Sequence, residues 1–295
     1  MIGPATVRSL RVRRPWRRRA FALLLALWGL ILIGLVAASF QRETRVGTML
    51  ARNAMENAKA EALADAGVER AILALLDPDP KTAWRCDGRS YLFDLGEGTV
   101  KIRIQDEGGK VDLNHAPLPV LMALFQGIGA DSVGARKLAD TILDYADRDS
   151  NRRPVGAEGP DYAAAGLQDG PKDAPFDRKE ELLRVLGMTK AIYDAIASDV
   201  TVYSGRSDIN LSTASELVLR AIPGLTVQQR DQIIAARSSG VPSQRLRIET
   251  VTVLADAATT GGGRFIRETV ARLSGGPGRP FQILSWRHTW QSERR

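Results

Sequence analysis

Apolar residues form one unbroken block near the start of the chain. The block, Ala20 to Phe40, is 21 residues long and carries no charge. At a rise of about 1.5 Å per residue, a helix of this length crosses a hydrocarbon core about 30 Å thick. The block is too long for an ordinary signal peptide, and no small-residue cleavage site follows it. The pattern therefore predicts one membrane-spanning helix.

The helical pattern continues beyond this block. No proline follows Phe40 until Pro78, and the intervening residues are mostly good helix formers. We expect a single helix of roughly 55 residues, half in lipid and half amphipathic. Its soluble half needs a sheet or neighbouring helices to cover its apolar stripe, and a bare membrane stalk is the alternative. The predicted stripe consists of Val46, Leu50, Ala54, Ala58, Leu63, Ala66, Ile72, Leu75 and Leu76.

Further along the chain, the period changes from that of a helix to that of a strand. Alternating residues at 91–95 and 99–106, around a Gly-Glu-Gly turn, predict a β-hairpin. Alternation returns only near the C-terminus, at 247–254, 264–273 and 280–287. The long stretch between these two groups has helical periodicity. The layout predicts an α+β fold in which a small antiparallel sheet is interrupted by a helical insertion.

The insertion contains an internal repeat. Residues 111–124 align with residues 209–222, and each segment is followed by a glycine turn and a second helical pattern. Asn114 and Ser212 are the predicted N-caps, because their side-chain oxygens can accept bonds from first-turn N–H groups. A third, looser unit covers residues 180–196. The pattern resembles the helix-hairpin-helix module, which in DNA-binding proteins presents backbone N–H groups to phosphate. Only the first copy keeps both glycines, which favours a structural use.

An acidic loop in the insertion has the spacing of oxygen ligands to a metal. The predicted ligands are Asp147, Asp149, Asn151 and Glu158 at the first, third, fifth and twelfth positions of an EF-hand spacing, with Asp161 as a further ligand. Hard oxygen ligands favour Ca²⁺ over Zn²⁺. Arg152 stands where an EF-hand has glycine, and Pro154 interrupts the flanking helix. We therefore expect a Ca²⁺ site with a different backbone path, and a solvated acidic loop is the alternative.

Charge is concentrated at the N-terminus. The chain has 41 basic and 34 acidic residues and a net charge of +7. The first 19 residues hold seven arginines and no acidic residue, so the remainder balances at 34 against 34. By the positive-inside rule, this leader stays in the cytoplasm and the rest of the chain crosses the membrane. The balanced remainder lacks the basic surface of a nucleic-acid-binding protein.

The sequence offers little catalytic chemistry. Its only histidines, His115 and His288, stand in no recognisable nucleophile motif, and there is no phosphate-binding loop or Cys/His cluster. We therefore expect no enzymatic activity. Cys86 is the single cysteine, so no disulfide can form within the chain, and we expect its thiol to be buried.

The order of these features resembles the minor pseudopilin K family of type II secretion systems, over nearly all of residues 17–290. The segments that carry the resemblance are ALLLALW, AGVERAILAL, DEGGKVDLN, DRDSNRRPVGAEGPDY, VTVYSG and DINLSTASELVL. The resemblance implies a pilin-like fold: a long N-terminal helix packed on a small antiparallel sheet, with a large helical insertion of helix-hairpin-helix or SAM-like type. It also implies Ca²⁺ bound in that insertion.

The resemblance further implies a place in the cell and a set of partners. The protein would be a single-pass inner-membrane protein of bacteria with its C-terminal domain in the periplasm. It would be the tip subunit of the pseudopilus, initiating assembly and supporting protein export, since its wide insertion is hard to stack upon. The implied partners are minor pseudopilins I and J, the major pseudopilin and the prepilin peptidase, with no nucleic acid.

Two positions near the N-terminus bear on processing. Prepilin leaders end in glycine, and the matching bond here is Ala20–Phe21, so cleavage there is expected with alanine in place of glycine. Position five of the mature chain would be Leu25, where most pilins carry Glu; Leu25 and Trp28 lie in the transmembrane part of the helix. A carboxylate in lipid is costly unless a neighbouring subunit supplies a partner for it. A subunit with no neighbour above it therefore has no need of a Glu at this position.

The predicted organisation has five parts. They are a basic cytoplasmic leader at 1–20, a transmembrane and spine helix at 21–78, the first strands of the pilin sheet at 79–107, an inserted α-domain at 108–242 and the returning strands at 243–295. The rival function is a membrane-anchored helix-hairpin-helix DNA receptor, because INLSTASELVLRAIPGL also resembles the hairpin of competence receptors.

Overall fold

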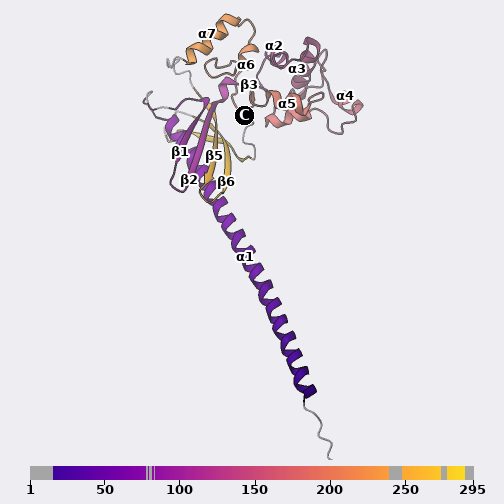
Figure 1. The fold of residues 1–295 in the computed structure, drawn as a ribbon. Coiled ribbons are helices and arrows are strands. Elements are labelled where there is room, and N and C mark those ends of the chain that lie inside the picture. The colour runs from indigo at the N-terminus through magenta and orange to yellow at the C-terminus, as the bar shows by residue number, and fades with distance from the viewer. Residues whose placement is uncertain are drawn as a thin grey trace, which may run out of the picture. The chain divides into compact units, whose positions relative to one another are not determined.

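The chain is described by a computed structural model that covers residues 16–77, 79, 82, 84–238, 248–273 and 278–289, without the side chains of 16–20 and 40–44. The chain divides into two compact units, residues 1–56 and 57–295. The predicted single long helix is confirmed: α1 extends from Trp16 to Leu75, 60 residues (Figure 1). Most of the predicted leader, together with Pro78 and the boundary at 242–243, lies outside the described residues.

The second unit contains a five-stranded antiparallel sheet in the order β1-β2-β5-β6-β7. Its strands are β1 (Asp87–Asp94), β2 (Gly98–Asp106), β5 (Thr250–Thr259), β6 (Arg264–Arg272) and β7 (Gln282–His288). The predicted β1–β2 hairpin is confirmed, with Phe93 opposite Val100. Strand β2 then pairs with β5, from Gly98 opposite Thr259 to Asp106 opposite Val251. Two neighbouring strands of one sheet are therefore separated in sequence by the whole insertion (Figure 1).

One face of this sheet is covered by the C-terminal part of α1. Alternate residues of β2 point to this face, so Val100, Ile102 and Ile104 are fully buried. They share a hydrophobic core with Val68 and Ala71 of the helix. The sheet of its own domain thus covers the end of the helix, from Ala60 to Ala74, as one of the two sequence alternatives proposed.

The face of the helix that packs on the sheet is displaced from the predicted stripe. The buried positions are Ala60, Ala64, Val68, Ala71, Ile72 and Ala74. The predicted Ala54, Ala58 and Ala66 are exposed, and Val46 and Leu50 are 57% and 64% exposed. Of the predicted stripe, Ile72 is buried and Leu63 and Leu75 are partly buried, whereas Leu76 is exposed. Small residues fit either face of a helix, so the sheet, and not the sequence period alone, decided which alanines are buried.

The insertion between β2 and β5 has a core of its own, which includes Leu121, Phe125, Ile142 and Leu219. Its elements are η1 (Glu107–Gly109), β3 (Val111–Asp112), α2 (Leu118–Gly127), α3 (Ser132–Ala146), α4 (Gly159–Ala164), η2 (Lys179–Arg184), α5 (Lys190–Ile196), β4 (Val200–Thr201), α6 (Glu216–Arg220) and α7 (Val227–Ser238). Strands β3 and β4 form a short parallel ladder, with Val111 opposite Val200.

Both predicted N-caps are wrong. Helix α2 begins after Pro117, and the Asn114 side chain instead exchanges two hydrogen bonds with the backbone of Phe176, at 2.7 and 3.0 Å. Helix α6 is capped by Ser215, whose hydroxyl accepts from Val218 N at 3.1 Å, and not by Ser212. In both copies the helix begins three residues later than expected, because a tight turn precedes it.

A buried carboxylate ties the insertion to the sheet. Glu107 is 2% exposed and accepts hydrogen bonds from Lys110 Nζ at 2.5 Å, from Thr252 Oγ1 at 2.7 Å and from the Thr201 hydroxyl. Burial by itself would raise the pKa of Glu107, but the Lys110 ammonium and the hydrogen bonds outweigh it and lower the pKa. One side chain thus joins the start of the insertion, its β4 strand and the central strand β5.

Candidate functional site

The acidic loop lies between helices α3 and α4. Helix α3 ends because Asp147 adopts an extended conformation, and its N–H closes the last turn on Leu143. The loop then turns at Asp149, whose carboxylate accepts from Asn151 N at 2.8 Å. At its far end, Glu158 starts α4 and is 5% exposed. The two ends of the predicted ligand set are thus held by two helix termini.

Several carboxylates act on Glu158. Burial is the main cause that raises its pKa, to about 7, and the negative charges of Asp144, Asp147, Asp173 and Asp149 raise it further. Within the described part of the chain, Glu158 Oε1 and Asp147 Oδ1 are buried oxygens without a hydrogen-bond partner. Buried acceptors without donors are costly, and a positive charge nearby would relieve both the burial and the repulsion.

Two arginines neutralise part of this charge. Arg153 Nη1 lies 2.9 Å from Asp144 Oδ1 and 2.6 Å from Asp147 Oδ2. Arg152 Nη1 lies 3.0 Å from Asp161 Oδ1, and the other Asp161 oxygen accepts from Glu158 N at 3.0 Å. Both oxygens of Asp161 are therefore already engaged. The hydrogen bond from Glu158 N is the main cause of its lowered pKa.

Sequence spacing missed two acidic residues that share this region, Asp144 and Asp173. Asp144 lies one turn before Asp147 on α3, and its side chain is fully buried. The loop backbone crosses it so closely that a Cβ on Gly156 would lie 1.9 Å from Asp144 Oδ2. The helical spacing of Asp144 and Asp147 was a usable signal. Asp173 lies beyond α4, and no local pattern connects it to the loop.

The chemistry of this cluster suits a hard divalent cation. The atoms available to a metal ion are all carboxylate and amide oxygens. Two of these oxygens are buried and accept no hydrogen bond. A cleft of about 510 Å³ adjoins Glu158 and Asp161. However, no three His, Cys, Asp or Glu side chains in the described ranges converge closely enough to hold a metal ion as they stand. Ligand side chains would have to converge on binding.

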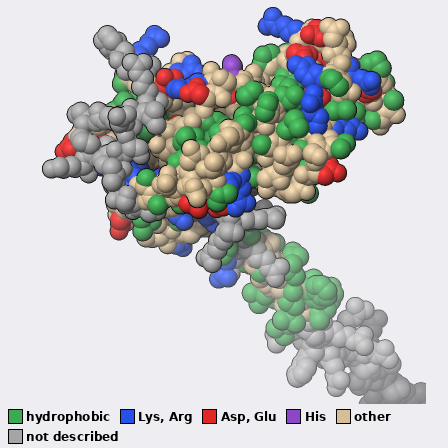
Figure 2. Space-filling view, turned by 90° about the horizontal axis from the view of Figure 1, so that it is seen from above, with side chains coloured by type: hydrophobic (Ala, Val, Ile, Leu, Met, Phe, Trp, Pro, Cys, Tyr) green, Lys and Arg blue, Asp and Glu red, His purple; other side chains and the backbone are tan. Residues whose placement is uncertain are grey.

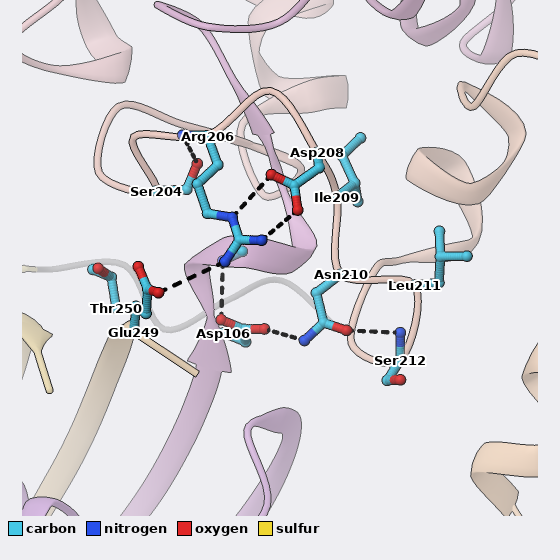
Figure 3. A pocket seen from close by; sticks show the side chains of 11 residues that line it. Asp106, Ser204, Arg206, Asp208, Ile209, Asn210, Leu211, Ser212, Glu249 and Thr250 are labelled. Atoms are coloured by element: carbon cyan, nitrogen blue, oxygen red, sulfur yellow. Dashed lines mark hydrogen bonds and ion pairs between the residues drawn. The ribbon is translucent and has the colours of Figure 1, made fainter. Parts of the chain in front are cut away.

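A second cleft, of about 570 Å³, lies where the insertion meets the sheet. Figure 3 shows Arg206 reaching toward Asp208, Glu249 and Asp106. Arg206 Nε donates to Asp208 Oδ1 at 3.0 Å, and Nη1 lies 3.8 Å from Glu249. Asp106 accepts from Asn210 Nδ2 at 2.7 Å. These bonds link the β2 end to the segment after β4, which gives the cleft a structural role.

The hairpin turns are poorly suited to bind phosphate. In the first hairpin, the N–H groups of Ile128, Gly129 and Ala130 donate to carbonyls at the end of α2, at 3.0–3.2 Å. The N-terminus of α3 is capped by a carboxylate, Asp131, which accepts from Gly134 N at 2.6 Å. Residues 108–242 contain 15 basic and 18 acidic residues. On the face drawn in Figure 2, basic and acidic side chains lie interspersed, not gathered into one basic surface.

The remaining candidate chemical groups have structural partners. His115 Nδ1 lies 3.0 Å from Asp112 Oδ1, and His288 stacks on Phe265 with ring centroids 4.2 Å apart. Cys86 is 2% exposed, which confirms the expected buried thiol. Burial is the main cause that raises its pKa to about 12, so the reactive thiolate is suppressed.

The N-terminal unit carries the membrane candidate. Residues Phe21–Ser39 have a mean hydropathy of 2.7, and none of this segment is buried. Leu25 and Trp28 are 57% and 65% exposed, as a lipid-facing helix requires. The Ala20–Phe21 bond lies inside the helix, five residues from its first residue. This helix fits a single-pass membrane anchor.

A long N-terminal helix that packs on a small antiparallel sheet, with a helical domain inserted between two paired strands, defines a pilin-like protein. Residues 102–205 match the family described as "Type II secretion system (T2SS), protein K". The fold matches a chain of the GspK–GspI–GspJ complex from enterotoxigenic Escherichia coli, with a TM-score of 0.57 and 18% identity, over 84% of this chain and 100% of that one. No curated protein sequence was found to match. Residues 102–205 are thus similar to protein K of type II secretion systems, and the fold is that of a protein in the GspK–GspI–GspJ complex; both matches confirm the resemblance to minor pseudopilin K found in the sequence.

Proposed function

We propose that this protein is the tip subunit of a type II secretion pseudopilus, where it initiates assembly and supports protein export without catalysing a reaction. The observation that carries the proposal is the helical insertion between β2 and β5 in a pilin-like fold, which lies largely within the matched residues 102–205. The insertion adds a second hydrophobic core to the unit formed by residues 57–295, which we call the head. A head of this bulk favours the end of a filament over a position between two stacked subunits.

The proposed partners follow from the related complex. That complex contains GspK with GspI and GspJ. We expect this chain to assemble with the corresponding I and J subunits and then with the major pseudopilin. We also expect the prepilin peptidase to cut between Ala20 and Phe21, with the leader in the cytoplasm and residues after Phe40 in the periplasm.

Purification of the full chain from membranes tests this proposal. Subunits I and J should co-purify with it, and N-terminal sequencing should begin at Phe21. Deleting residues 108–242 should keep the helix and sheet but allow the subunit to be incorporated along the filament. Recovery without I and J would contradict the proposed function, and a strong shift of DNA mobility by the full chain would favour the DNA-receptor alternative.

We further propose that the acidic loop binds Ca²⁺. Asp147 and Glu158 would be the central ligands, with Asp149 and Asn151 from the original set and Asp144 added. The support is the pair of buried oxygens without donors and the raised pKa of Glu158. Asp161, already engaged by Arg152 and by the α4 backbone, would serve as a ligand only if that ion pair opened.

Thermal unfolding in Ca²⁺ and in EGTA tests the metal proposal. Saturation at 100 times Kd would stabilise the folded protein by about 2.7 kcal/mol. Asp147→Asn should remove this gain. Asp169→Asn is the matched control, since Asp169 lies in the exposed segment after α4 and should leave the gain intact. Equal melting temperatures of the unaltered protein in Ca²⁺, Mg²⁺ and EGTA would contradict a Ca²⁺ site.

A further inference from the structure

The helix–sheet contact contains little that would stop the helix from sliding along its own axis. The buried face of α1 consists mainly of alanine, at Ala60, Ala64, Ala71 and Ala74, with Val68 and Ile72 among them. After a shift of one turn, about 5.4 Å, Ala64 would take the place of Ala60, so the small residues of this face do little to fix the register. The register of the helix on the sheet must be set by other residues.

Arg267 on β6 is one such residue. Its side chain is 8% exposed and forms ion pairs with two acids on successive turns of α1, Asp65 at 2.7 Å and Glu61 at 2.8 Å. Its guanidinium also lies over two aromatic rings, 4.7 Å from the centroid of Phe265 and 4.9 Å from that of Trp286. A planar cation that is paired with two acids and also contacts two rings has little freedom to change its position or orientation.

The acids that Arg267 contacts belong to a longer series at one-turn spacing. Glu61, Asp65 and Glu69 lie at positions i, i+4 and i+8 of α1. A slide of one turn in one direction would give Arg267 Asp65 and Glu69, again two acids. A slide in the other direction would give it Asn57 and Glu61, one acid. Arg267 alone therefore excludes only one of the two displaced registers.

Gly67 excludes the other. A Cβ at this position would lie 2.7 Å from Val100 Cγ1 and 3.3 Å from Ala255 Cβ, so the helix approaches β2 and β5 more closely here than any other residue type permits. A slide of one turn would bring Leu63 or Ala71 to this place, and each carries a Cβ. Only the observed register places a glycine at the close contact with the sheet and also gives Arg267 two acidic partners.

We propose that Gly67 and Arg267 are positioning residues that set the register of the spine helix on the head domain. By setting this register, the two residues determine how many helical residues lie between the apolar span and the sheet. The functional consequence rests on the proposed function, because in a filament the helices and the heads of neighbouring subunits must both be in register. The register itself is a property of the single chain.

Site-specific cross-linking in membranes measures the register directly. Lys59 Nζ lies 3.2 Å from Glu97 Oε2 at the β1–β2 turn. In the full-length protein, the pair Lys59→Cys with Glu97→Cys should be joined by a short bismaleimide. The pairs Leu63→Cys or Met55→Cys with Glu97→Cys report a one-turn slide in either direction. Cys86 is buried, so it does not compete in the folded protein.

The expected result is a change in the ratio of these products. Gly67→Ala and Arg267→Ala should each raise the displaced products relative to the 59–97 product by about twofold or more. Gly47→Ala is the matched control on the same helix, because a Cβ there meets nothing within 4 Å. An unchanged ratio with a lower melting temperature would show that both residues only stabilise the fold, and would overturn the proposal.

A milder pair of variants covers the case in which these proteins fail to accumulate. Glu61→Gln leaves Arg267 one acid in the observed register and two after a slide, so the 63–97 product should rise. Glu69→Gln removes an acid that matters only after a slide, so that product should not rise. Equal ratios in the two variants would contradict the proposal. Loss of I and J binding, by contrast, would contradict the proposed function and leave this ratio unaffected.

Discussion

The two helical hairpins of the insertion share a local pattern but differ in how their second helices are packed. Eight residues of α3 are buried, whereas no described residue of α7 is. Each hairpin has a glycine at positive φ between its helices, Gly129 at 98° and Gly224 at 81°. The turn is therefore a local property, because only glycine adopts this conformation readily. Burial is a property of the whole domain.

The residues at equivalent positions of α3 and α7, counted from the first residue of each helix, explain the difference. Ala135 and Ile142 of α3 are fully buried, and arginines, Arg230 and Arg237, occupy the corresponding places in α7. Arg237 Nη1 reaches back to donate to Ala214 O at 2.7 Å. The second copy thus uses its helix to satisfy backbone carbonyls, where the first uses its helix to fill a core. A sequence repeat preserves the shape of a turn without preserving what its helix contacts.

The largest expected effect is the loss of a buried residue from α3. Ile142→Ala should lower the free energy of unfolding by about 2–5 kcal/mol, because it leaves a cavity in the core of the insertion. Ile234→Ala in α7 should change it by less than about 0.5 kcal/mol, since Ile234 is 37% exposed. Urea unfolding of the detergent-solubilised protein measures both. Similar losses would show that the Ile234 side of α7 is also packed in solution.

The next largest effect on stability is expected at Asn114, which aligns with Ser212 in the repeat; the sequence predicts both as N-caps. Asn114→Ala removes two hydrogen bonds to Phe176 and should cost about 1–3 kcal/mol. Ser212→Ala, its partner in the repeat, should cost much less, because α6 is capped by Ser215. Thermal unfolding of the two variants separates these roles. If Ser212→Ala cost as much as Asn114→Ala, the two copies would be equivalent after all.

A smaller effect should distinguish the hairpins by pH, since only α3 leads into the acidic loop. Glu158 has an ordinary pKa of 4.5 and a folded pKa of about 7, so the folded protein binds more protons between these values. Stability in EGTA should therefore fall as the pH rises from about 4.5 to about 7. Ca²⁺ should reduce this loss.

Glu158→Gln supplies the control for that measurement. It removes the titrating carboxyl and should flatten the dependence of melting temperature on pH in this range. Glu216→Gln, in α6 of the second hairpin, should leave the dependence as it is. An equally steep dependence in Glu158→Gln would assign the titration to another group, for which burial makes Asp144 the first candidate.

The smallest expected effect is on DNA mobility. The first hairpin has both glycines but a carboxylate at the start of α3, and its turn N–H groups donate within the hairpin. The full chain should leave DNA mobility unchanged at moderate salt. Asp131→Ala removes the repelling carboxylate and should still give no shift. A salt-sensitive shift that this variant strengthened would revive phosphate binding by the hairpin.

The order of elements could be predicted because it depends on local patterns. The long helix, the first hairpin of strands and the glycine turns each depend on neighbouring residues. Strand β5 extends to Thr259, well past the predicted end. The sequence did not indicate this extension, because Ala255 and Ala257 have little strand preference of their own; pairing with β2 makes them strand residues, and they are buried in the core that includes α1. The missed ligands of the acidic loop have the same cause, since Asp173 joins it only through the fold.

By itself, the sequence determined the apolar span, the single helix through Leu75, the interruption of the sheet by a helical domain and the family resemblance. These follow from residue types at short spacing. Only the tertiary structure decided which alanines of α1 face the sheet, that Arg267 meets Glu61 and Asp65 more than 200 residues away, and that Asp144 lies beside Glu158. The reason is physical: small and charged residues fit several environments, and long-range packing selects one.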